Sequence, residues 1–465
     1  MTTNTNIREL VLDILIEVNE KDQYSHLVIR SVLDKYQYLD KKERAFLTRL
    51  AEGTIEHQIE MDYMIDSFSK VKVRKMKPLI RNLLRMSVYQ LRYMDAIPDS
   101  AVCNEAVKLA KKRGFRQLSG FVNGVLRSIV REGDKLLYPD AAIEPKRYLE
   151  VKYSVPGWII NRWMKAYGYE QTETILSHFY QESPLTIRTN RTKCTPEELR
   201  TKLINEQVTV EKIGEIPAES GEFKDALDRL WDYAYTISDF DHLQSLQTFQ
   251  DGDFYVQDIS SMLVAEMAAP KKGDYVIDVC AAPGGKSSHI AELMDGTGMV
   301  EARDLTEYKT NLIEENISRT DSINIQARVM DATVFDVDSE LRADIVLADV
   351  PCSGYGVIGK KPEIKYRVTP QKQEEIVILQ KTILDRAAEY VKPGGVLVFS
   401  TCTIAREENE ENMMWFMNNY PFKLESLDPY LPEELHSETT ALGYLQLLPG
   451  VHKTDGFFIA KFRRK

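Results

Sequence analysis

The stretch Asp278-Val279-Cys280-Ala281-Ala282-Pro283-Gly284-Gly285-Lys286-Ser287-Ser288 decides how the C-terminal half of this chain folds. An apolar strand pattern runs into a turn of small residues and glycines, and a helix pattern follows. Such a turn lets backbone approach a ligand, and the helix N-terminus offers it free N–H groups. A phosphate-binding P-loop is excluded because it needs glycine at position 280, and the dinucleotide pattern G-x-G-x-x-G is also absent. The stretch therefore predicts a nucleoside ligand without a pyrophosphate, and S-adenosylmethionine is the obvious candidate.

Strand and helix patterns alternate along the chain around this stretch. Strands are expected at 275–279, 299–304, 324–331, 343–349 and 396–400, and helices at 287–293, 306–318 and 370–390. This alternation is typical of a doubly wound, mainly parallel α/β sheet. We expect a Rossmann-like domain of the class I methyltransferase type over residues 251–465. A last strand at 457–462, pairing with 443–448, would complete it.

Acidic residues end four successive expected strands. They are Asp278, Asp304, Asp331 and Asp349. One acidic strand end is usually a helix cap, but four on one edge of a sheet favour a cofactor site. By the logic of dinucleotide-binding folds, Asp304 would accept the ribose hydroxyls. Asp331 would receive the adenine amine, and Asp349 would lie beside the methionine end. The predicted cofactor-binding residues are these four together with Cys280, Ala281, Ala282, Pro283, Gly284, Gly285 and Lys286.

Two cysteines also follow expected strands, Cys352 in Asp349-Val350-Pro351-Cys352-Ser353-Gly354 and Cys402 in Ser400-Thr401-Cys402-Thr403. A lone cysteine is more often a buried small hydrophobe. Two cysteines at adjacent strand ends can instead converge over one cleft, where open α/β sheets bind their ligands.

These thiols suit one particular chemistry. A thiolate that adds to carbon-6 of a pyrimidine makes carbon-5 nucleophilic toward a methyl sulfonium. Cys402 would supply the thiolate, and Asp349 the acid near ring N3. Cys352 or a water would assist removal of the carbon-5 proton and release of the enzyme. Lys286 either lowers a thiol pKa or touches the base, or it is an ordinary first-turn lysine.

Residues 1–135 show apolar spacing typical of a helical bundle. Helices are expected at 7–18, 39–68, 76–94, 100–112 and 117–130, with Asp99-Ser100 as the cap of the fourth. Two basic clusters are candidate phosphate contacts, and the alternative for each is a solvated charged face. The predicted RNA-binding residues here are Lys70, Lys72, Arg74, Lys75, Lys111, Lys112 and Arg113.

The middle of the chain changes character twice. Residues 136–168 are expected to hold a linker and a helix, with 133–150 interpreted as linker and a helical pair at 155–167 and 169–181. Residues 169–250 predict a small α+β, ferredoxin-like module with strands at 185–191, 208–210 and 233–237. Thr195-Pro196-Glu197-Glu198 would cap its helix. The candidate RNA contacts in this module are Arg188, Asn190 and Arg191, although surface Arg and Asn side chains are usually only solvated.

Composition limits the function classes. The chain has 465 residues and a net charge of −11, yet its first 140 residues are net positive. This asymmetry is compatible with local phosphate binding. Five scattered cysteines without a C-x-x-C pair argue against disulfides and a zinc site, and for a reducing cytoplasm. No apolar run is long enough to span a membrane, and the N-terminus lacks a secretory pattern. We expect a monomeric cytoplasmic protein without a metal.

Two stretches carry resemblances to known families. Ser119-Gly120-Phe121-Val122-Asn123-Gly124-Val125-Leu126-Arg127 resembles the NusB family of RNA-binding bundles, which implies RNA contact. From about residue 170 the chain resembles the NOL1/Nop2/Sun family of RNA cytosine-5 methyltransferases. The matching motifs are 255–258, 280–286, Asp304, Asp331, 349–354, 401–403 with 407–409, and 455–458.

The second resemblance implies roles for both cysteines. The cysteine of the Thr-Cys motif, Cys402, would be the nucleophile, and that of the Pro-Cys motif, Cys352, would aid product release. Together with the bundle it implies a 16S ribosomal RNA substrate, methylated before the small subunit is fully assembled. Two positions depart from the expected pattern. Thr403 stands where the family usually has serine, and Arg303 is unusual beside a cofactor carboxylate.

Two other functions remain open. The protein could methylate a transfer RNA or another ribosomal site, with the bundle as a docking arm. It could also be a non-catalytic RNA-binding or antitermination factor that keeps a methyltransferase-like sheet, although intact Cys402, Cys352 and Asp349 speak against this. DNA methylation is less favoured, because DNA enzymes use the Pro-Cys cysteine as nucleophile and need no second one.

Overall fold

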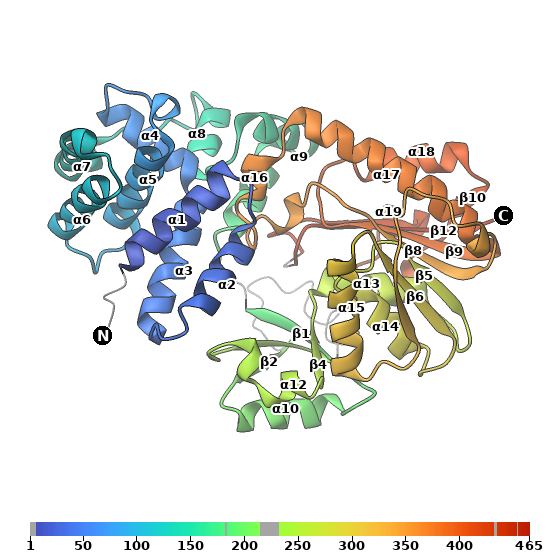
Figure 1. Cartoon of the computed structure of the whole chain (residues 1–465). Coiled ribbons are helices and arrows are strands. Elements are labelled where there is room, and N and C mark those ends of the chain that lie inside the picture. Colours follow the sequence, from blue (N-terminus) through green and yellow to red (C-terminus); the bar gives the residue numbers. More distant parts are fainter. Residues whose placement is uncertain (1–5, 182–183, 214–231, 432–434, 453) are drawn as a thin grey trace. The chain divides into compact units, whose positions relative to one another are not determined.

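The computed structural model describes residues 6–181, 184–213, 232–431, 435–452 and 454–465 (Figure 1). The chain forms two compact units. Unit 1 contains residues 1–179 and the short segment 358–368, and unit 2 contains 180–357 and 369–465. No helix within the described ranges is long and apolar enough to cross a membrane.

Unit 1 is helical. Its helices are α1 (Ile7–Glu20), α2 (Ser25–Lys35), α3 (Lys41–Glu56), α4 (Gln58–Phe68), α5 (Pro78–Tyr93), α6 (Asp99–Lys112), α7 (Ser119–Glu132), α8 (Pro145–Lys152) and α9 (Gly157–His178), with α16 (Ile364–Arg367) from the later segment. Helix α5 packs on α1, α3, α4, α6 and α7 and is buried around most of its circumference. Apolar side chains such as Leu50, Leu83 and Leu126 fill the core between them. The expected all-helical bundle is confirmed.

Several details of this unit differ from expectation. The span 39–68 is two helices that meet at His57, and α2 was not predicted. The cap of α6 is Pro98, and Asp99 is already its first helical residue. Helix α8 begins inside the 133–150 segment interpreted as linker and extends to Lys152. Pro145 suggested a loop, but it occupies the first turn of α8, where proline needs no N–H partner.

A four-stranded antiparallel sheet opens unit 2. Its strands are β1 (Leu185–Thr189), β2 (Thr209–Lys212), β3 (Ala234–Ser238) and β4 (Phe254–Val256), in the order β2-β3-β1-β4, and α10 (Pro196–Asn205) packs with it. Thr195 and Glu198 form the capping box that the sequence predicted. The ferredoxin-like module is therefore confirmed, and residues 214–231 of its predicted range lie outside the described residues. Strand β4 pairs with β1, although its sequence was assigned to the following domain.

The second sheet of unit 2 carries the predicted strand ends. Its strands are β5 (Tyr275–Asp278), β6 (Met299–Asp304), β7 (Ile325–Val329), β8 (Ala343–Asp349), β9 (Val391–Thr401), β10 (Phe422–Leu424), β11 (Tyr444–Leu447) and β12 (Phe457–Arg464). Their order is β10-β12-β9-β8-β5-β6-β7, with β11 paired to β12. Strands β5 to β9 are parallel, and β12 runs antiparallel to β9. The chain moves outward from β5 to β7 and then returns to β8, so the strand order reverses between β5 and β8.

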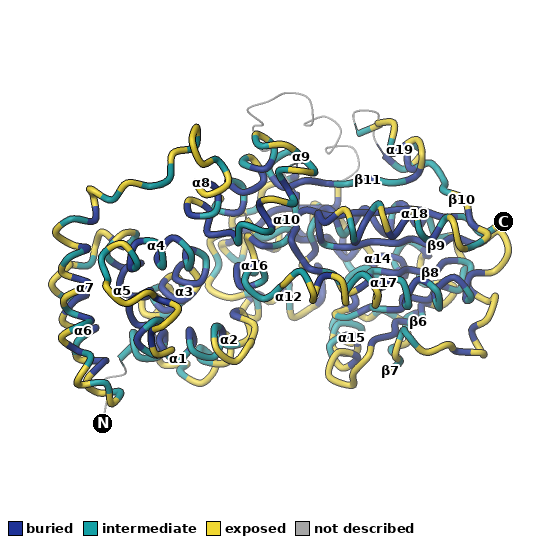
Figure 2. Tube along the Cα trace, turned by 90° about the horizontal axis from the view of Figure 1, so that it is seen from above, coloured by how far each residue is buried: buried dark blue, intermediate teal, exposed yellow. Residues whose placement is uncertain are grey.

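Helices cover both faces of this sheet (Figure 1). One face packs against α13 (Ile259–Ala268), α14 (Gly285–Leu293) and α15 (Glu307–Thr320), and the other against α17 (Pro370–Tyr390) and α18 (Glu410–Asn419). Neighbouring side chains on a strand point to opposite faces, so Val276 and Ile277 belong to different clusters. Strands β8 and β9 are buried along most of their length (Figure 2). The predicted doubly wound, mainly parallel sheet is confirmed.

Candidate active site

The reversal of strand order brings the predicted residues to one edge of the sheet. Asp278 ends β5 and Asp349 ends β8, its parallel neighbour. Asp349 is paired in register with Ser400 of β9, and Cys402 lies just beyond that strand. Ligands of open α/β sheets bind outside the carboxyl ends of the strands at such a reversal. The fold therefore provides a reason for these side chains to gather.

The two cysteines of this edge are in contact. The sulfur atoms of Cys352 and Cys402 lie 3.1 Å apart. Their loops are joined by a 2.7 Å hydrogen bond between the hydroxyl oxygens of Ser353 and Thr403. The N–H of Gly356 donates to the carbonyl oxygen of Cys402 at 3.0 Å. The hydroxyl of Thr403, which a serine at this position would also supply, is thus part of the contact between the two loops.

Only glycine fits where these loops meet the last strand. A Cβ atom on Gly356 would come within 1.8 Å of the carbonyl oxygen of Gly456. The N–H of Gly456 in turn donates to the carbonyl oxygen of Gly356 at 3.0 Å. This close backbone crossing fixes the Cys352 loop against the segment that leads into β12.

Lys286 and Asp349 form an ion pair beside the cysteines. The Nζ of Lys286 lies 2.8 Å from Oδ2 of Asp349, and the hydroxyl of Ser400 donates to Oδ1 at 2.8 Å. The ammonium also lies 5.3 Å from the centre of the Phe457 ring. Burial lowers the pKa of Lys286, but the neighbouring Asp349 carboxylate outweighs burial and leaves this pKa raised. Lys286 is therefore a largely buried cation, and it is not an ordinary solvated lysine.

Two of the thiols near this edge are held in the protonated form. The hydrogen bond with Cys402, followed by burial, raises the pKa of Cys352 well above its ordinary value. Burial and then the negative charge of Asp278 do the same for the pKa of Cys280. Cys280 is therefore a half-buried, protonated thiol of the glycine-rich loop.

Asp278 lies under this loop with one oxygen unsatisfied. Its Oδ2 accepts a 2.7 Å hydrogen bond from the hydroxyl of Ser287. Its buried Oδ1 has no hydrogen-bond partner among the described residues. Burial raises the pKa of Asp278 to about 7. Gly284 has a φ of 102°, and no atom lies within 4 Å of the place where a Cβ on Gly285 would stand. An orphaned acceptor and an open glycine loop fit a nucleoside cofactor that carries an amino group.

Asp304 holds the loop to the end of β6. Its Oδ2 accepts the N–H of Ala282 at 3.0 Å, and its Oδ1 accepts the N–H of Leu305 at 2.8 Å. The Nζ of Lys309 lies 2.9 Å from Oδ1. Most of its acceptor capacity is therefore in use, and its ribose-binding role stays a prediction.

Arg303 points to the other face of the sheet from Asp304. Its Nε donates to Glu301 at 2.7 Å, and a terminal nitrogen lies 3.2 Å from Asp336. Its guanidinium also lies 5.2 Å from the centre of the Tyr390 ring. The alternation of side chains along β6 thus explains how an arginine can stand beside a cofactor carboxylate.

Asp331 is exposed just beyond β7. Its Oδ1 accepts hydrogen bonds from the hydroxyl and the N–H of Thr333, at 2.7 and 2.9 Å. These hydrogen bonds lower the pKa of Asp331. The side chain is ionised, and its role with adenine remains a prediction.

Sequence reasoning assigned no role to Glu408 and Asn409, which secure the cysteine loops. Fully buried Glu408 accepts the N–H of Ser353 at 2.8 Å. Asn409 accepts from the hydroxyl of Thr401 at 2.6 Å and donates to the carbonyl oxygen of Thr403 at 2.9 Å. The Glu407-Glu408-Asn409 motif was the available signal, but its partners are distant in sequence.

The predicted RNA contacts in unit 1 divide into two groups. Lys70, Lys72, Arg74, Lys75 and Lys111 are exposed. Lys112 and Arg113 form ion pairs with Glu9 and Asp13, at 2.5 and 2.6 Å. The cations of the first group are therefore less occupied by ion pairs with neighbouring carboxylates.

The structure corrects two of the predicted RNA contacts. Arg188 and Asn190 have exposed fractions of 0% and 1%. Arg188 forms an ion pair with buried Glu292 of α14, and its guanidinium lies 4.3 Å from the centre of the Tyr255 ring. The amide of Asn190 donates to the carbonyl oxygens of Gly252, at 2.9 Å, and of Thr320 in α15, at 3.2 Å. Both residues attach the small module to the larger domain, because a polar group near a strand end can face a neighbouring helix as readily as solvent.

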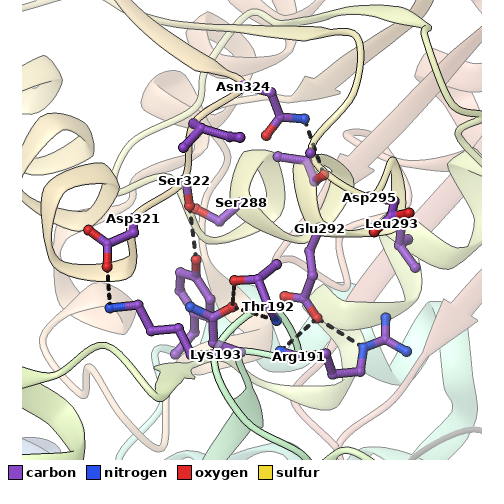
Figure 3. A pocket seen from close by; sticks show the side chains of 15 residues that line it. Arg191, Thr192, Lys193, Ser288, Glu292, Leu293, Asp295, Asp321, Ser322 and Asn324 are labelled. Carbon is purple, nitrogen blue, oxygen red and sulfur yellow. Dashed lines mark hydrogen bonds and ion pairs between the residues drawn. The ribbon is translucent and has the colours of Figure 1, made fainter.

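Arg191 lies at the rim of a cavity of about 830 Å³ between the 190–193 loop, α14 and residues 321–324 (Figure 3). Its Nε lies 2.9 Å from Glu292, and Lys193 forms a 2.6 Å ion pair with Asp321. The cations of this cavity are thus neutralised by neighbouring carboxylates.

Within the described ranges, no group of three or more His, Cys, Asp or Glu side chains is arranged to hold a metal ion.

Comparison with known proteins supports the fold and the family. The family described as 16S rRNA methyltransferase RsmB/F matches residues 265–463, and the NusB family matches residues 5–131. The RsmF/B-like ferredoxin-like domain matches residues 155–218. These matches confirm the resemblances found in the bundle, the module and the sheet.

Curated relatives and solved structures extend this likeness. The probable ribosomal RNA small subunit methyltransferase B of Bacillus subtilis is 40% identical over 464 residues, covering 99% of each chain. A protein of the same name from Synechocystis is 32% identical, covering 98% of this chain and 99% of its own. The crystal structure of PH0851 aligns over all of both chains with a TM-score of 0.81 and 27% identity. A methyltransferase homolog from Pyrococcus horikoshii aligns over 70% of this chain and all of its own, with a TM-score of 0.55 and 26% identity.

The domain matches and the full-length relatives agree with the site, where a glycine-rich loop and an orphaned Asp278 oxygen fit S-adenosylmethionine. This chain belongs to the RsmB/F family of S-adenosylmethionine-dependent 16S ribosomal RNA methyltransferases.

Proposed function

We propose that this protein methylates carbon-5 of a cytosine in 16S ribosomal RNA through a transient bond between Cys402 and carbon-6 of that base. The observation that carries this proposal is the 3.1 Å contact between the sulfurs of Cys402 and Cys352 at the cofactor edge of the sheet. A single thiol there would serve many reactions. Two thiols in contact suit a reaction in which one sulfur attacks the base and must later leave it.

Cys402 begins the reaction as a thiolate. Its sulfur adds to carbon-6, and the displaced ring electrons make carbon-5 nucleophilic while ring N3 gains a proton. The Lys286–Asp349 pair supplies that proton, because Lys286 is a largely buried cation hydrogen-bonded to Asp349. When bound by the 280–286 loop and Asp278, S-adenosylmethionine supplies an electrophilic methyl group to carbon-5.

Release of the product breaks the bond between Cys402 and carbon-6 that formed first. A water removes the proton from carbon-5, ring N3 returns its proton to the Lys286–Asp349 pair, the ring double bond re-forms, and the bond between carbon-6 and sulfur breaks. The electron pair of that bond leaves with Cys402 as a thiolate. The thiol of Cys352 then hydrogen-bonds to the departing sulfur and stabilises its negative charge. Cys352 acts in this role as a donor, which agrees with its raised pKa.

The exposed cations of unit 1 are the proposed RNA contacts. Lys70, Lys72, Arg74, Lys75 and Lys111 would neutralise backbone phosphates, which gives affinity but no sequence specificity. We propose that a monomer acts on 16S RNA before the small subunit is complete. A transfer RNA or another ribosomal site is the alternative substrate.

One experiment separates these substrates. The protein is incubated with labelled S-adenosylmethionine and naked 16S RNA, assembled small subunits or transfer RNA, and the modified base is mapped. We expect carbon-5 of one cytosine in naked 16S RNA to be labelled. If label appears only in transfer RNA or in assembled subunits, that RNA is the substrate in place of naked 16S RNA. Label on another atom, or on no RNA, would refute the proposed chemistry.

A further inference from the structure

Glu408 is a buried carboxyl group that clamps the loop carrying Cys352. Its Oε2 accepts the N–H of Ser353 at 2.8 Å. The same oxygen accepts the side-chain amide of Gln380 at 3.1 Å, and Gln380 also donates to the carbonyl oxygen of Pro351 at 2.9 Å. Both neighbours of Cys352 in the chain are therefore bound through Glu408 and Gln380.

The donors around Glu408 indicate that it is ionised. Its Oε1 accepts the amide of Gln373 at 3.2 Å, so three N–H groups donate to Glu408, and the side chain of Ser353 is a further donor. A protonated carboxyl group would also need an acceptor for its own hydrogen. Burial raises the pKa of Glu408, and the hydrogen bonds from Ser353, Gln373 and Gln380 oppose this rise.

Charge is distributed unevenly between the two cysteines. Within the described residues, Glu408 has no ion pair, and its hydrogen-bonding neighbours on the Cys352 loop and on α17 are neutral. The next shell is neutral too, because Asn412 donates to the side chain of Gln380 at 2.7 Å. The largely buried cation of the site, Lys286, interacts electrostatically with Cys402. An uncompensated negative charge thus lies beside Cys352, and a positive charge acts on Cys402.

We infer that Glu408 decides which of the two touching cysteines is the nucleophile: its carboxylate keeps Cys352 a thiol and leaves the thiolate to Cys402. Two adjacent thiols that share one hydrogen bond would otherwise compete for the negative charge. Glu408 touches neither sulfur in the hydrogen bonds described, so it is a positioning residue. This inference rests on the proposed function, because it explains how that reaction would assign different roles to its two sulfurs.

The test is a titration of each cysteine in the full-length protein without RNA or cofactor. The rate of iodoacetamide labelling is measured from pH 6 to pH 10, and mass spectrometry reads the Cys352 and Cys402 peptides separately. For Glu408→Gln we expect the labelling midpoint of Cys352 to fall by about one pH unit, because a nearby negative charge has been removed. The midpoint of Cys402 should stay or rise. An unchanged Cys352 midpoint, or an equal fall at both cysteines, would overturn the inference.

Two further variants separate charge from structure. Glu411→Gln removes the same charge from an exposed neighbouring position and should leave both midpoints unchanged. The double variant Glu408→Gln, Gln373→Glu returns a carboxylate to the cluster and lets the new amide donate to it. The Cys352 midpoint should then move back toward the wild-type value. A shift with Glu411→Gln, or no recovery in the double variant, would assign the effect to general electrostatics or to misfolding.

The rate of methylation gives an independent test of the role of Glu408. With 16S RNA, Glu408→Gln should lower kcat by about tenfold while KM stays within about twofold, because binding is untouched and the competent thiolate is less populated. Unchanged kcat would count against the inference. The thiol titration needs no RNA, so it can succeed even if no RNA is methylated. Conversely, Cys402→Ala and Cys352→Ala can behave as proposed while the Cys352 midpoint of Glu408→Gln does not move. In that case only the inferred role of Glu408 is refuted.

Discussion

The sulfur of Cys352 lies 3.1 Å from the sulfur of Cys402, although the two residues are 50 positions apart in the chain. Strands β8 and β9 produce this contact, because parallel pairing places Asp349 opposite Ser400 and both chain segments leave the sheet at the same edge. The contact makes the two thiols interdependent, and their substitutions should therefore have different outcomes.

Cys402→Ala should abolish methylation, because no thiolate remains to attack carbon-6. Cys352→Ala should permit attack but slow release, so a covalent protein–RNA adduct should accumulate. Denaturing electrophoresis with labelled 16S RNA checks both outcomes, and Cys103→Ala in unit 1 serves as the control. An adduct with the Cys402 variant in place of the Cys352 variant would reverse the assignment.

Lys286→Met should impair the chemical step more than binding of RNA. The substitution removes the cation that is paired with Asp349 at 2.8 Å and that also acts on Cys402. We expect kcat to fall by about 10² to 10⁴, as for loss of a general acid. Labelling of Cys402 with iodoacetamide should also need a higher pH, because thiolate formation loses a neighbouring positive charge.

Lys272→Met is the matched control for this prediction, because Lys272 is exposed and paired with Asp295. It should leave both readouts unchanged. If Lys286→Met raised KM for RNA with an unchanged kcat, Lys286 would be a binding residue and the proton would have another source.

The elements that the sequence predicts best have strong local signals. Helix α17 begins at Pro370 because Thr369 caps it and proline fits its first turn, and both signals are visible in the sequence. Strand β8 ends at Asp349 because an apolar run stops there. Asp278 was found for the same reason, since it follows the apolar run Tyr275-Val276-Ile277.

The missed features depend on partners that are distant in sequence. Arg188 was assigned to RNA because its partner, Glu292, is 104 positions away on another element. Glu408 was given no role because Ser353, Gln373 and Gln380 reach it only in the folded chain. Local sequence reveals where a strand ends, but it does not reveal which charged side chains become buried against each other.

Arg188→Ala should destabilise the protein without a specific loss of RNA affinity. The guanidinium is fully buried, and its removal leaves the buried carboxylate of Glu292 with Arg191 as its remaining partner. Breaking a buried ion pair from one side costs about 3–5 kcal/mol. Arg191 will compensate in part, so a value at the lower end is expected.

Urea denaturation measures this loss, and filter binding measures RNA affinity. Arg131→Ala is the control, because Arg131 is an exposed residue paired with its neighbour Glu132. Such surface substitutions usually change the free energy of unfolding by no more than about 0.5 kcal/mol. A stable Arg188→Ala protein with weakened RNA binding would restore the original assignment of Arg188 to RNA.

Lys365 should make the stability of unit 1 increase with pH. It lies in the 358–368 segment, which connects the Cys352 loop to α17, and its Nζ donates to the carbonyl oxygens of Glu56 and Tyr153 at 2.8 and 3.4 Å. Burial lowers its pKa to about 7 from 10.5. Between these values the unfolded chain binds a proton that the folded chain lacks, so folding becomes more favourable as pH rises, by up to about 1.4 kcal/mol per pH unit.

Lys365→Met isolates this effect, because methionine has similar bulk and does not titrate. The carbonyl oxygen of Glu56 keeps a donor, since the hydroxyl of Tyr366 also reaches it at 3.0 Å. Glu52, whose pKa is raised to about 7 by desolvation and by Glu56 and Glu363, acts below pH 7 and is unchanged in both proteins. Unfolding midpoints of the two proteins, measured from pH 7 to pH 9.5, should rise more steeply with pH for the wild type. Parallel pH curves would mean that Lys365 stays charged when buried, with the two carbonyl oxygens sufficient to stabilise its ammonium.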